Sequence, residues 1–363
     1  TGNDRFDNAP NKDDWYETIK LNYGVDYCNP CGERTEHFDP IPSTWKKMTD
    51  ILLFWARKGV DGFRCDMAEM VPSAFWTYAI KEVKNEFPYI LFIGEVYNPS
   101  LYDTYIQSGF DYLYDKVGMY DCVRGVIAGT RKPTEITKQW QATDHIKNKM
   151  LYFLENHDEQ RIASPFFAND AEKGFPGVVV SSLLLPNPFM LYAGQELGEP
   201  GMDAEGFSGR DGRTTIFDYW GIDKLYRGYY KKNALTAQEK VIWDKYNAIL
   251  RIASKEKVVS VGSFFDLMYA NPLTSNFNSN SLYAFIRAYK QEVLLVVANF
   301  SDLEMQCAIN IPRHAFEHLS LSEGQVNAVD LLTGETTFQM FSPEKPFKVG
   351  IDPYGARVYK FTL

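Results

Sequence analysis

The chain has 363 residues, enough for more than one domain and for a large core. Its net charge of −9 argues against nucleic acid or another polyanion as a partner and suits a neutral ligand. No stretch is apolar over enough residues to cross a bilayer, and the opening residues are polar, unlike a secretory signal. The compartment stays open between the periplasm, the exterior and the cytoplasm.

The five cysteines are scattered along the chain, which does not indicate a disulfide framework. Cys28 and Cys31 form a C-x-x-C motif, a spacing found in redox pairs and in half of some zinc sites. Neither a second C-x-x-C nor a histidine pair accompanies it. We therefore predict no metal site and no redox function.

Residues 1–38 are polar and rich in predicted loops. Apolar residues at helical spacing then predict a helix over 44–58, with Ser43 as its N-cap and Gly59 as a left-handed C-cap. A second helix is predicted to open at Pro72. Its inward face should carry Trp76, Ile80 and Val83.

Several short apolar runs, separated by helical segments, are predicted to be strands. They lie at 60–66, 90–96, 110–115, 149–155 and near 188–193. Three of them carry an acidic residue at or just beyond the C-terminal end, namely Asp66, Glu95 and Asp158. This arrangement is typical of a parallel β/α barrel, whose active site lies at the C-terminal ends of its strands.

The last barrel helix is predicted to start at Thr236, where Thr236 and Glu239 fit a capping box. After about residue 258 the helical period disappears. Short alternating runs broken by turns then predict an all-β module of the sandwich kind.

Arg64 and Asp66 are two residues apart on a predicted strand, so their side chains point the same way. A neighbouring guanidinium favours the ionised carboxylate that a nucleophile requires. From this stretch alone, a purely structural ion pair explains the two residues equally well.

Four motifs together resemble the signature regions of the α-amylase family of glycoside hydrolases. They are GFRCDMA (62–68), IGEVY (93–97), FLENHD (153–158) and PFMLYAGQE (188–196), and they occur in the family's order. Leu21-Asn22 resembles a further short segment of the family, whereas Asn187 stands near a position where the family usually has glycine.

The resemblance implies an α/β fold with a (β/α)8 TIM-type barrel, of which strands four to eight are recognised and the N-terminal strands are expected to be missing from this chain. It implies three parts: 1–38 as the remnant of an inserted loop domain, 39–258 as the barrel portion and 259–363 as a C-terminal β-sandwich domain. The expected partner, besides substrate, is the missing barrel segment or a protein that covers the open barrel edge.

The resemblance also implies the roles of six residues. Asp66 would be the nucleophile, Glu95 the general acid and base, and Asp158 the third carboxylate, which binds sugar hydroxyls. Substrate-binding roles would fall to Arg64, His157 and Tyr97. For His157 the alternative is a buried, hydrogen-bonded structural histidine.

The implied reaction is retaining hydrolysis of α-1,4-glucosidic bonds in starch or maltooligosaccharides. Aromatic residues make up 15% of the chain, and a handful of them are expected to stack on sugar rings in the cleft. An α-glucan transglycosylase using the same site, and a non-catalytic carbohydrate-binding or inactive fragment, are the alternatives. All three carboxylates are present, which argues against the non-catalytic alternative.

Glu69 and Met70 stand where many α-amylases have Lys-His, a pair that helps to hold calcium. We therefore expect no required cofactor. Calcium is possible, but the family's usual calcium site is in doubt.

Overall fold

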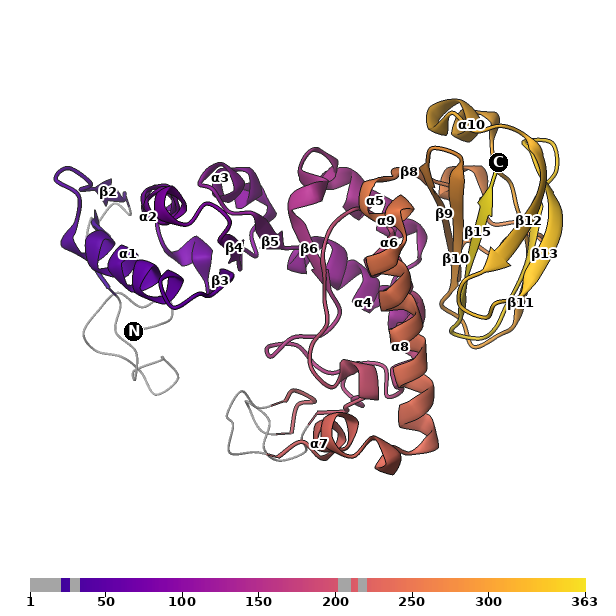
Figure 1. The fold of residues 1–363 in the computed structure, drawn as a ribbon, viewed down its shortest axis with the longest axis horizontal. Coiled ribbons are helices and arrows are strands. Elements are labelled where there is room, and N and C mark those ends of the chain that lie inside the picture. Colours follow the sequence, from indigo (N-terminus) through magenta and orange to yellow (C-terminus); the bar gives the residue numbers. More distant parts are fainter. Residues whose placement is uncertain (1–20, 27–32, 202–209, 215–220) are drawn as a thin grey trace. The chain divides into compact units, whose positions relative to one another are not determined.

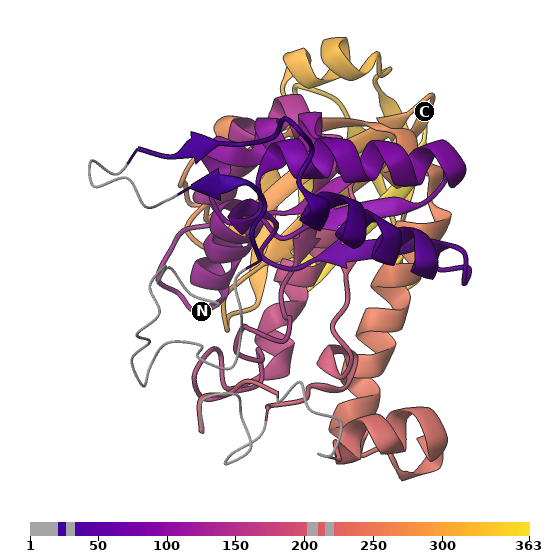
Figure 2. The same cartoon turned by 90° about the vertical axis from the view of Figure 1, so that its left-hand side faces the viewer.

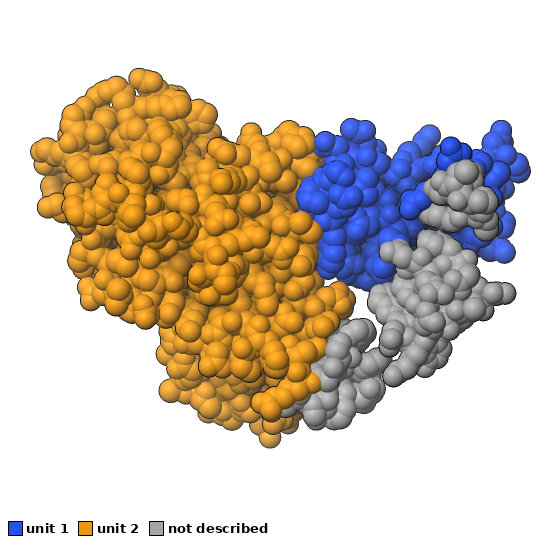
Figure 3. All heavy atoms as spheres, turned by 180° about the vertical axis from the view of Figure 1, so that it is seen from behind, with its two compact units in different colours: residues 1–114 blue, residues 115–363 orange. Residues whose placement is uncertain are grey.

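A computed structural model describes residues 21–26, 33–201, 210–214 and 221–363. The chain divides into two compact units, residues 1–114 and 115–363 (Figure 3). Cys28, Cys31 and most of the predicted segment 1–38 lie outside the described residues. Within the described residues, no helix is both long and apolar enough to cross a membrane.

The first unit alternates helices with short parallel strands. Strand β3 pairs with β4, and β4 pairs with β5, all in parallel (Figure 1). The helices and strands of this unit are β1 Val25–Asp26, β2 Thr35–Glu36, α1 Ser43–Ala56, β3 Gly62–Cys65, α2 Ser73–Glu86, β4 Leu91–Gly94, α3 Tyr102–Gln107 and β5 Tyr112–Tyr114, with short 3-10 turns at Ala68–Met70 and Pro99–Leu101.

Helices α1 and α2 lie side by side (Figure 1 and Figure 2). Trp45 of α1 packs edge-on against Phe75 of α2, with ring centroids 5.9 Å apart. The predicted inward face of α2 is confirmed, since Trp76, Ile80 and Val83 are all buried. Trp76 packs on Phe110 just before β5, with ring centroids 5.1 Å apart, so burial of this face stabilises α2 against the rest of the unit.

The predicted cap of α1 is wrong at one end and confirmed at the other. Ser43 is the first helical residue, and Pro42 occupies the cap position without any side-chain hydrogen bond. Proline suits this position because its fixed φ and missing N–H fit the start of a helix. Gly59 has φ +88°, the left-handed conformation expected where this helix gives way to β3.

The second unit begins with further helices and two parallel strands, β6 and β7. Every residue of α6 is buried, while α8 is amphipathic and begins with the capping box that Thr236 and Glu239 were predicted to form. Its elements are the π-helical turn Lys116–Tyr120, α4 Asp121–Ile127, α5 Thr134–Ala142, β6 Met150–Phe153, α6 Phe175–Leu183, β7 Phe189–Met190, α7 Asp223–Tyr230, α8 Ala237–Lys255 and α9 Lys257–Val261, with 3-10 turns at Asp144–Lys149, Ala171–Gly174, Gln195–Leu197 and Lys232–Ala234.

The same unit ends in antiparallel sheets (Figure 1). A six-stranded sheet has the order β13-β12-β15-β10-β9-β8, and β11 pairs with β14 in a second sheet. Phe347 of β14 stacks on Phe361 of β15 at 6.2 Å, so the two sheets share an apolar core. The strands are β8 Ser263–Asp266, β9 Leu282–Tyr289, β10 Glu292–Asn299, β11 Met305–Ile309, β12 Gly324–Asp330, β13 Thr336–Phe341, β14 Phe347–Ile351 and β15 Ala356–Thr362.

This sandwich confirms the predicted C-terminal fold, with one addition. The loop after β11 contains a seven-residue helix, α10 Arg313–Leu319, and a 3-10 turn spans Met268–Ala270. Helix α10 was missed because two turns leave too short a run for a helical period to be recognised.

Arg287 of β9 connects the sandwich to the preceding helices. Its side chain is fully buried. Its guanidinium donates to the carbonyl oxygen of Leu183 in α6 at 3.0 Å and to that of Val259 in α9 at 2.7 Å. Because a buried guanidinium needs its N–H groups paired, these contacts fix β9 to the C-terminal end of α6 and to α9.

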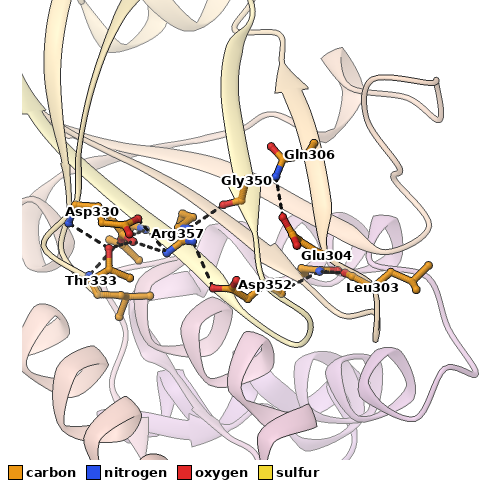
Figure 4. Close-up of polar contacts among 12 residues, drawn as sticks. Leu303, Glu304, Gln306, Asp330, Thr333, Gly350, Asp352 and Arg357 are labelled. Carbon is orange, nitrogen blue, oxygen red and sulfur yellow. Dashed lines mark hydrogen bonds and ion pairs between the residues drawn. The ribbon is translucent and has the colours of Figure 1, made fainter.

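A second buried charge closes the turn between β12 and β13. Asp330 is fully buried and accepts hydrogen bonds from Thr333 Oγ1 at 2.9 Å, from the N–H of Val358 at 3.0 Å and from Arg357 at 3.2 Å (Figure 4). Arg357 in turn donates to the carbonyl of Gly350 at 2.8 Å, which joins β14 to the same network.

Candidate active site

Asp66 and Glu95 emerge from neighbouring parallel strands at the same edge of the sheet. Cys65 and Gly94, the last residues of β3 and β4, are paired in register. The pairing continues past the strands, since the N–H of Glu95 donates to the carbonyl of Cys65 at 3.1 Å and the N–H of Ala68 to that of Glu95 at 3.0 Å. The backbone segments that carry Asp66 and Glu95 are therefore hydrogen-bonded to each other.

Arg64 bridges the two carboxylates. Its guanidinium forms an ion pair with Asp66 through Nη1 and with Glu95 Oε1 through Nη2, the latter at 2.7 Å. Burial alone would lower the pKa of Arg64, but attraction to Glu95 and hydrogen bonds to Asp66 and Tyr114 outweigh burial and raise the pKa. The ion pair considered as a structural alternative does form, and it also includes Glu95.

Glu95 is only 6% exposed and has a partner on each oxygen. Besides Arg64, Oε1 accepts from the hydroxyl of Tyr97 at 3.2 Å, and Oε2 accepts from the N–H of Met67 at 2.8 Å. The structure thus brings Arg64, Asp66, Glu95 and Tyr97 into one cluster in the first unit.

Met67 is part of this cluster, although the sequence analysis did not select it. Its φ of +43° and ψ of +44° are left-handed, a conformation that costs a residue with a side chain about 1–2 kcal/mol. The strained turn directs the N–H of Met67 at Glu95 immediately after Asp66. No sequence signal indicated it, since left-handed turns usually carry glycine or asparagine.

His157 and Asp158 lie together in the second unit, just beyond β6. His157 Nε2 is 3.2 Å from Asp158 Oδ2, and both side chains are about one-third exposed or more. Asn156 is buried, and its Oδ1 accepts from the N–H groups of Asp158 and Glu159, each at 2.9 Å. His157 is therefore not the fully buried histidine of the structural alternative.

A buried ion pair that the sequence analysis did not select supports this loop. Arg161 Nη1 lies 2.8 Å from Glu155 Oε2, with both side chains almost completely buried. Arg161 also donates to Thr214 Oγ1 at 2.8 Å, and its guanidinium lies 4.0 Å from the ring centre of Tyr192. The pair ties the end of β6 to the segments after β7, a long-range contact without a local sequence pattern.

Glu69 and Met70 are the two departures from the family pattern, and the contacts described for them are with protein groups. Glu69 Oε2 accepts from the N–H of Asn98 at 3.0 Å and so holds the segment after β4, while the Met70 side chain is partly exposed. Across the described residues, no three His, Cys, Asp or Glu side chains converge as a metal ion would require.

Comparison with known proteins identifies the family. Residues 41–244, more than half of the chain, match the family model for the catalytic domain of α-amylase. The chain belongs to the α-amylase family. This span includes both carboxylate clusters and all four signature motifs.

Curated relatives of the chain are distant and longer. It is 22% identical over 325 residues to neopullulanase 2 of Thermoactinomyces vulgaris, covering 88% of this chain and 48% of that protein. It is 24% identical over 282 residues to α-amylase 3 of Dictyoglomus thermophilum, covering 72% and 54%. The chain thus spans about half the length of these curated relatives.

Solved structures show the same fold. The crystal structure of the α-amylase from Geobacillus thermoleovorans in complex with acarbose covers 92% of this chain and 67% of its own chain, with a TM-score of 0.66 and 18% identity. This likeness confirms the predicted fold class, a part of an α-amylase barrel followed by a β-sandwich.

Proposed function

We propose that this chain carries the catalytic machinery of a retaining glycoside hydrolase that cleaves α-1,4-glucosidic bonds in starch or maltooligosaccharides. The observation that carries the proposal is the Arg64 bridge between Asp66 and Glu95 at the C-terminal ends of adjacent parallel strands. Retaining hydrolysis needs two carboxyl groups close to each other, one ionised and one able to transfer a proton.

The first half of the reaction falls to Asp66 and Glu95. Asp66 attacks the anomeric carbon while Glu95 gives its proton to the departing glycosidic oxygen, which leaves a covalent glycosyl-enzyme and a shortened sugar. Arg64 forms an ion pair with Asp66 and so orients the carboxylate of the nucleophile.

The second half reverses these roles. Glu95, now ionised, removes a proton from water, and the resulting hydroxide attacks the anomeric carbon and releases Asp66. The N–H of Met67 and the hydroxyl of Tyr97 stabilise the ionised Glu95 in this step.

Asp158 and His157 are proposed to bind hydroxyl groups of the sugar substrate. A carboxylate accepts from two hydroxyls, and an imidazole donates to or accepts from a third. Their exposure, roughly one-third or more, leaves both side chains able to reach a ligand.

Two variants separate the roles of the carboxyl groups. Asp66→Asn should lower turnover of maltoheptaose and of α-maltosyl fluoride by more than about 10³-fold, because no nucleophile remains. Glu95→Ala should lose maltoheptaose turnover but still form the glycosyl-enzyme from the fluoride, whose leaving group needs no proton. Release of the sugar should then be slow, because no base activates water, and an added anionic nucleophile such as azide should restore turnover of the fluoride. Asp50→Asn, an exposed carboxylate on α1, serves as the control.

If azide failed to restore turnover of the fluoride in Glu95→Ala, the role of Glu95 as acid and base would be contradicted. Undiminished activity in Asp66→Asn would remove the proposed mechanism altogether.

A further inference from the structure

The second unit contains a cavity of about 600 Å³ that no residue of the two carboxylate clusters lines. Its walls come from α5 and the turn that follows, and from β8 and α10. Trp140 and Gln141 stand on the first wall, and Phe264, Tyr269, His314 and His318 on the second. Cavities of this size are typical of sites for small ligands.

Trp140 is held in a fixed orientation. Its indole Nε1 donates to Asp266 Oδ2 at 2.8 Å, and its ring packs edge-to-face on Phe264 with centroids 5.0 Å apart. Asp266 is buried and accepts as well from Thr137 Oγ1 at 2.7 Å and Tyr283 at 2.8 Å, so the carboxylate cannot move away. The Trp140 ring is thus a preorganised surface for stacking, which lowers the entropic cost of binding.

The part of the lining formed by β8 and α10 offers a second aromatic surface with polar groups around it. Tyr269 is 62% exposed and tilts over Phe265 at 6.1 Å. His314 and His318 are exposed on one face of α10, and their rings also pack on Phe265, at 5.5 and 5.7 Å. These side chains combine ring faces with hydrogen-bonding atoms at the edge of the cavity.

The charged groups Asp144, Lys147 and Asp266 already have partners within the protein, which favours a neutral ligand. Lys147 Nζ lies 2.7 Å from Asp144 Oδ1, and Asp266 is occupied by its own donors. Gln141 and Asn148, both exposed, add amide donors and acceptors to the lining. Aromatic faces surrounded by neutral polar groups match a pyranose, which has apolar C–H faces and a rim of hydroxyls.

We propose that this cavity is a second, non-catalytic binding site for a neutral oligosaccharide, with Trp140 and Tyr269 as stacking surfaces. The choice of an α-glucan as its ligand rests on the proposed function. Such a site would hold a long substrate on the enzyme independently of the cleavage site.

Calorimetric titration with maltoheptaose tests the proposal on the protein that carries this chain, in an Asp66→Asn background that leaves the ligand intact. We expect two bound ligands per molecule. Adding Tyr269→Ala should weaken one of the two events at least about tenfold, the size of one lost stacking contact. Gln141→Ala should weaken the same event, and Tyr230→Ala, another highly exposed tyrosine outside the cavity, should change neither.

Tyr269 and Gln141 are exposed, so these variants test the cavity without removing the buried Trp140–Asp266 contact. With the native Asp66 restored, Tyr269→Ala should leave turnover of a short maltooligosaccharide unchanged. If the proposed function fails, the native protein will not cleave maltooligosaccharides, and one binding event sensitive to Tyr269→Ala will still be seen. An unchanged titration in Tyr269→Ala and Gln141→Ala, or no binding at all, overturns the second site.

Discussion

Arg64 shows how one side chain can hold two carboxylates together. A carboxylate beside a guanidinium is common on protein surfaces and usually contributes little. Here the guanidinium reaches two carboxylates from adjacent strands, and the backbone N–H of Met67 completes the coordination of one of them. The arrangement is therefore a cluster of contacts from two strands and not an isolated ion pair.

Asp115 provides a pH-dependent prediction at the scale of one residue. It follows β5 and is fully buried, with Oδ1 accepting from the N–H of Met119 at 2.9 Å. No hydrogen-bond partner for Oδ2 is found among the described residues. Burial raises the pKa of Asp115 from 3.8 to about 6, so the folded state favours its protonated form.

The stability from protonated Asp115 is complete below about pH 3.8 and is lost as pH rises through about 6. Asp115→Asn, which does not ionise, should therefore gain roughly 3 kcal/mol relative to the native protein between pH 4 and pH 7. Urea unfolding at both pH values measures this difference, with Asp244→Asn on the exposed face of α8 as control. A constant difference across the range would show that Asp115 does not titrate there.

At the scale of secondary-structure elements, Asp330 is predicted to stabilise the β12–β13 turn. Asp330→Ala removes the acceptor of the Val358 N–H and of Thr333, and it should lower the free energy of unfolding by about 3 kcal/mol. Asp352→Ala is the matched control, because Asp352 contacts the same Arg357 at 3.4 Å but is 72% exposed, and it should cost less than about 1 kcal/mol. Equal effects in chemical denaturation would contradict the role of burial.

The elements that sequence analysis predicted well are those with local signals. The face of α2, the capping box at Thr236 and the left-handed Gly59 were all expected from spacing and residue type, and the structure contains them. The carboxylates at the ends of β3 and β4 were likewise expected, because the alternation of strands and helices places strand ends together.

The elements it missed depend on contacts between distant residues. Glu155 and Arg161 lie in one loop, but Arg161 also contacts Thr214 and Tyr192 from the segments after β7. Met67 is left-handed where its N–H donates to Glu95, 28 residues further along the chain. On α1, Ile51 and Trp55 share the apolar face but are about half exposed, since helical spacing identifies a face without showing what covers it.

At the scale of the whole molecule, the chain spans about half the length of its curated relatives. Among the described strands, β3 pairs with β4 alone, and Ile51, Phe54 and Trp55 of α1 remain about half exposed. We propose that further barrel segments or a partner cover this edge and this face in the whole enzyme, because an unpaired strand edge and an apolar face are both costly in water.

This proposal predicts that a preparation containing only these 363 residues is weakly active or inactive on maltoheptaose. Intact mass should be measured on the same sample as reducing-sugar release, so that a longer or second species is detected. High turnover by a sample of this mass alone would show that the cleavage site needs no additional segment.

Asp66 is proposed to form a covalent bond to the sugar, and this intermediate can be trapped. A maltosyl fluoride with a second fluorine on the ring should react with the active enzyme and then release sugar slowly, because the added fluorine destabilises the oxocarbenium-like transition state. Peptide mapping by mass spectrometry should locate the adduct on Asp66, and Asp66→Asn should yield none. An adduct on another carboxylate, or rapid turnover of unmodified maltooligosaccharide with inverted product stereochemistry, would contradict the account.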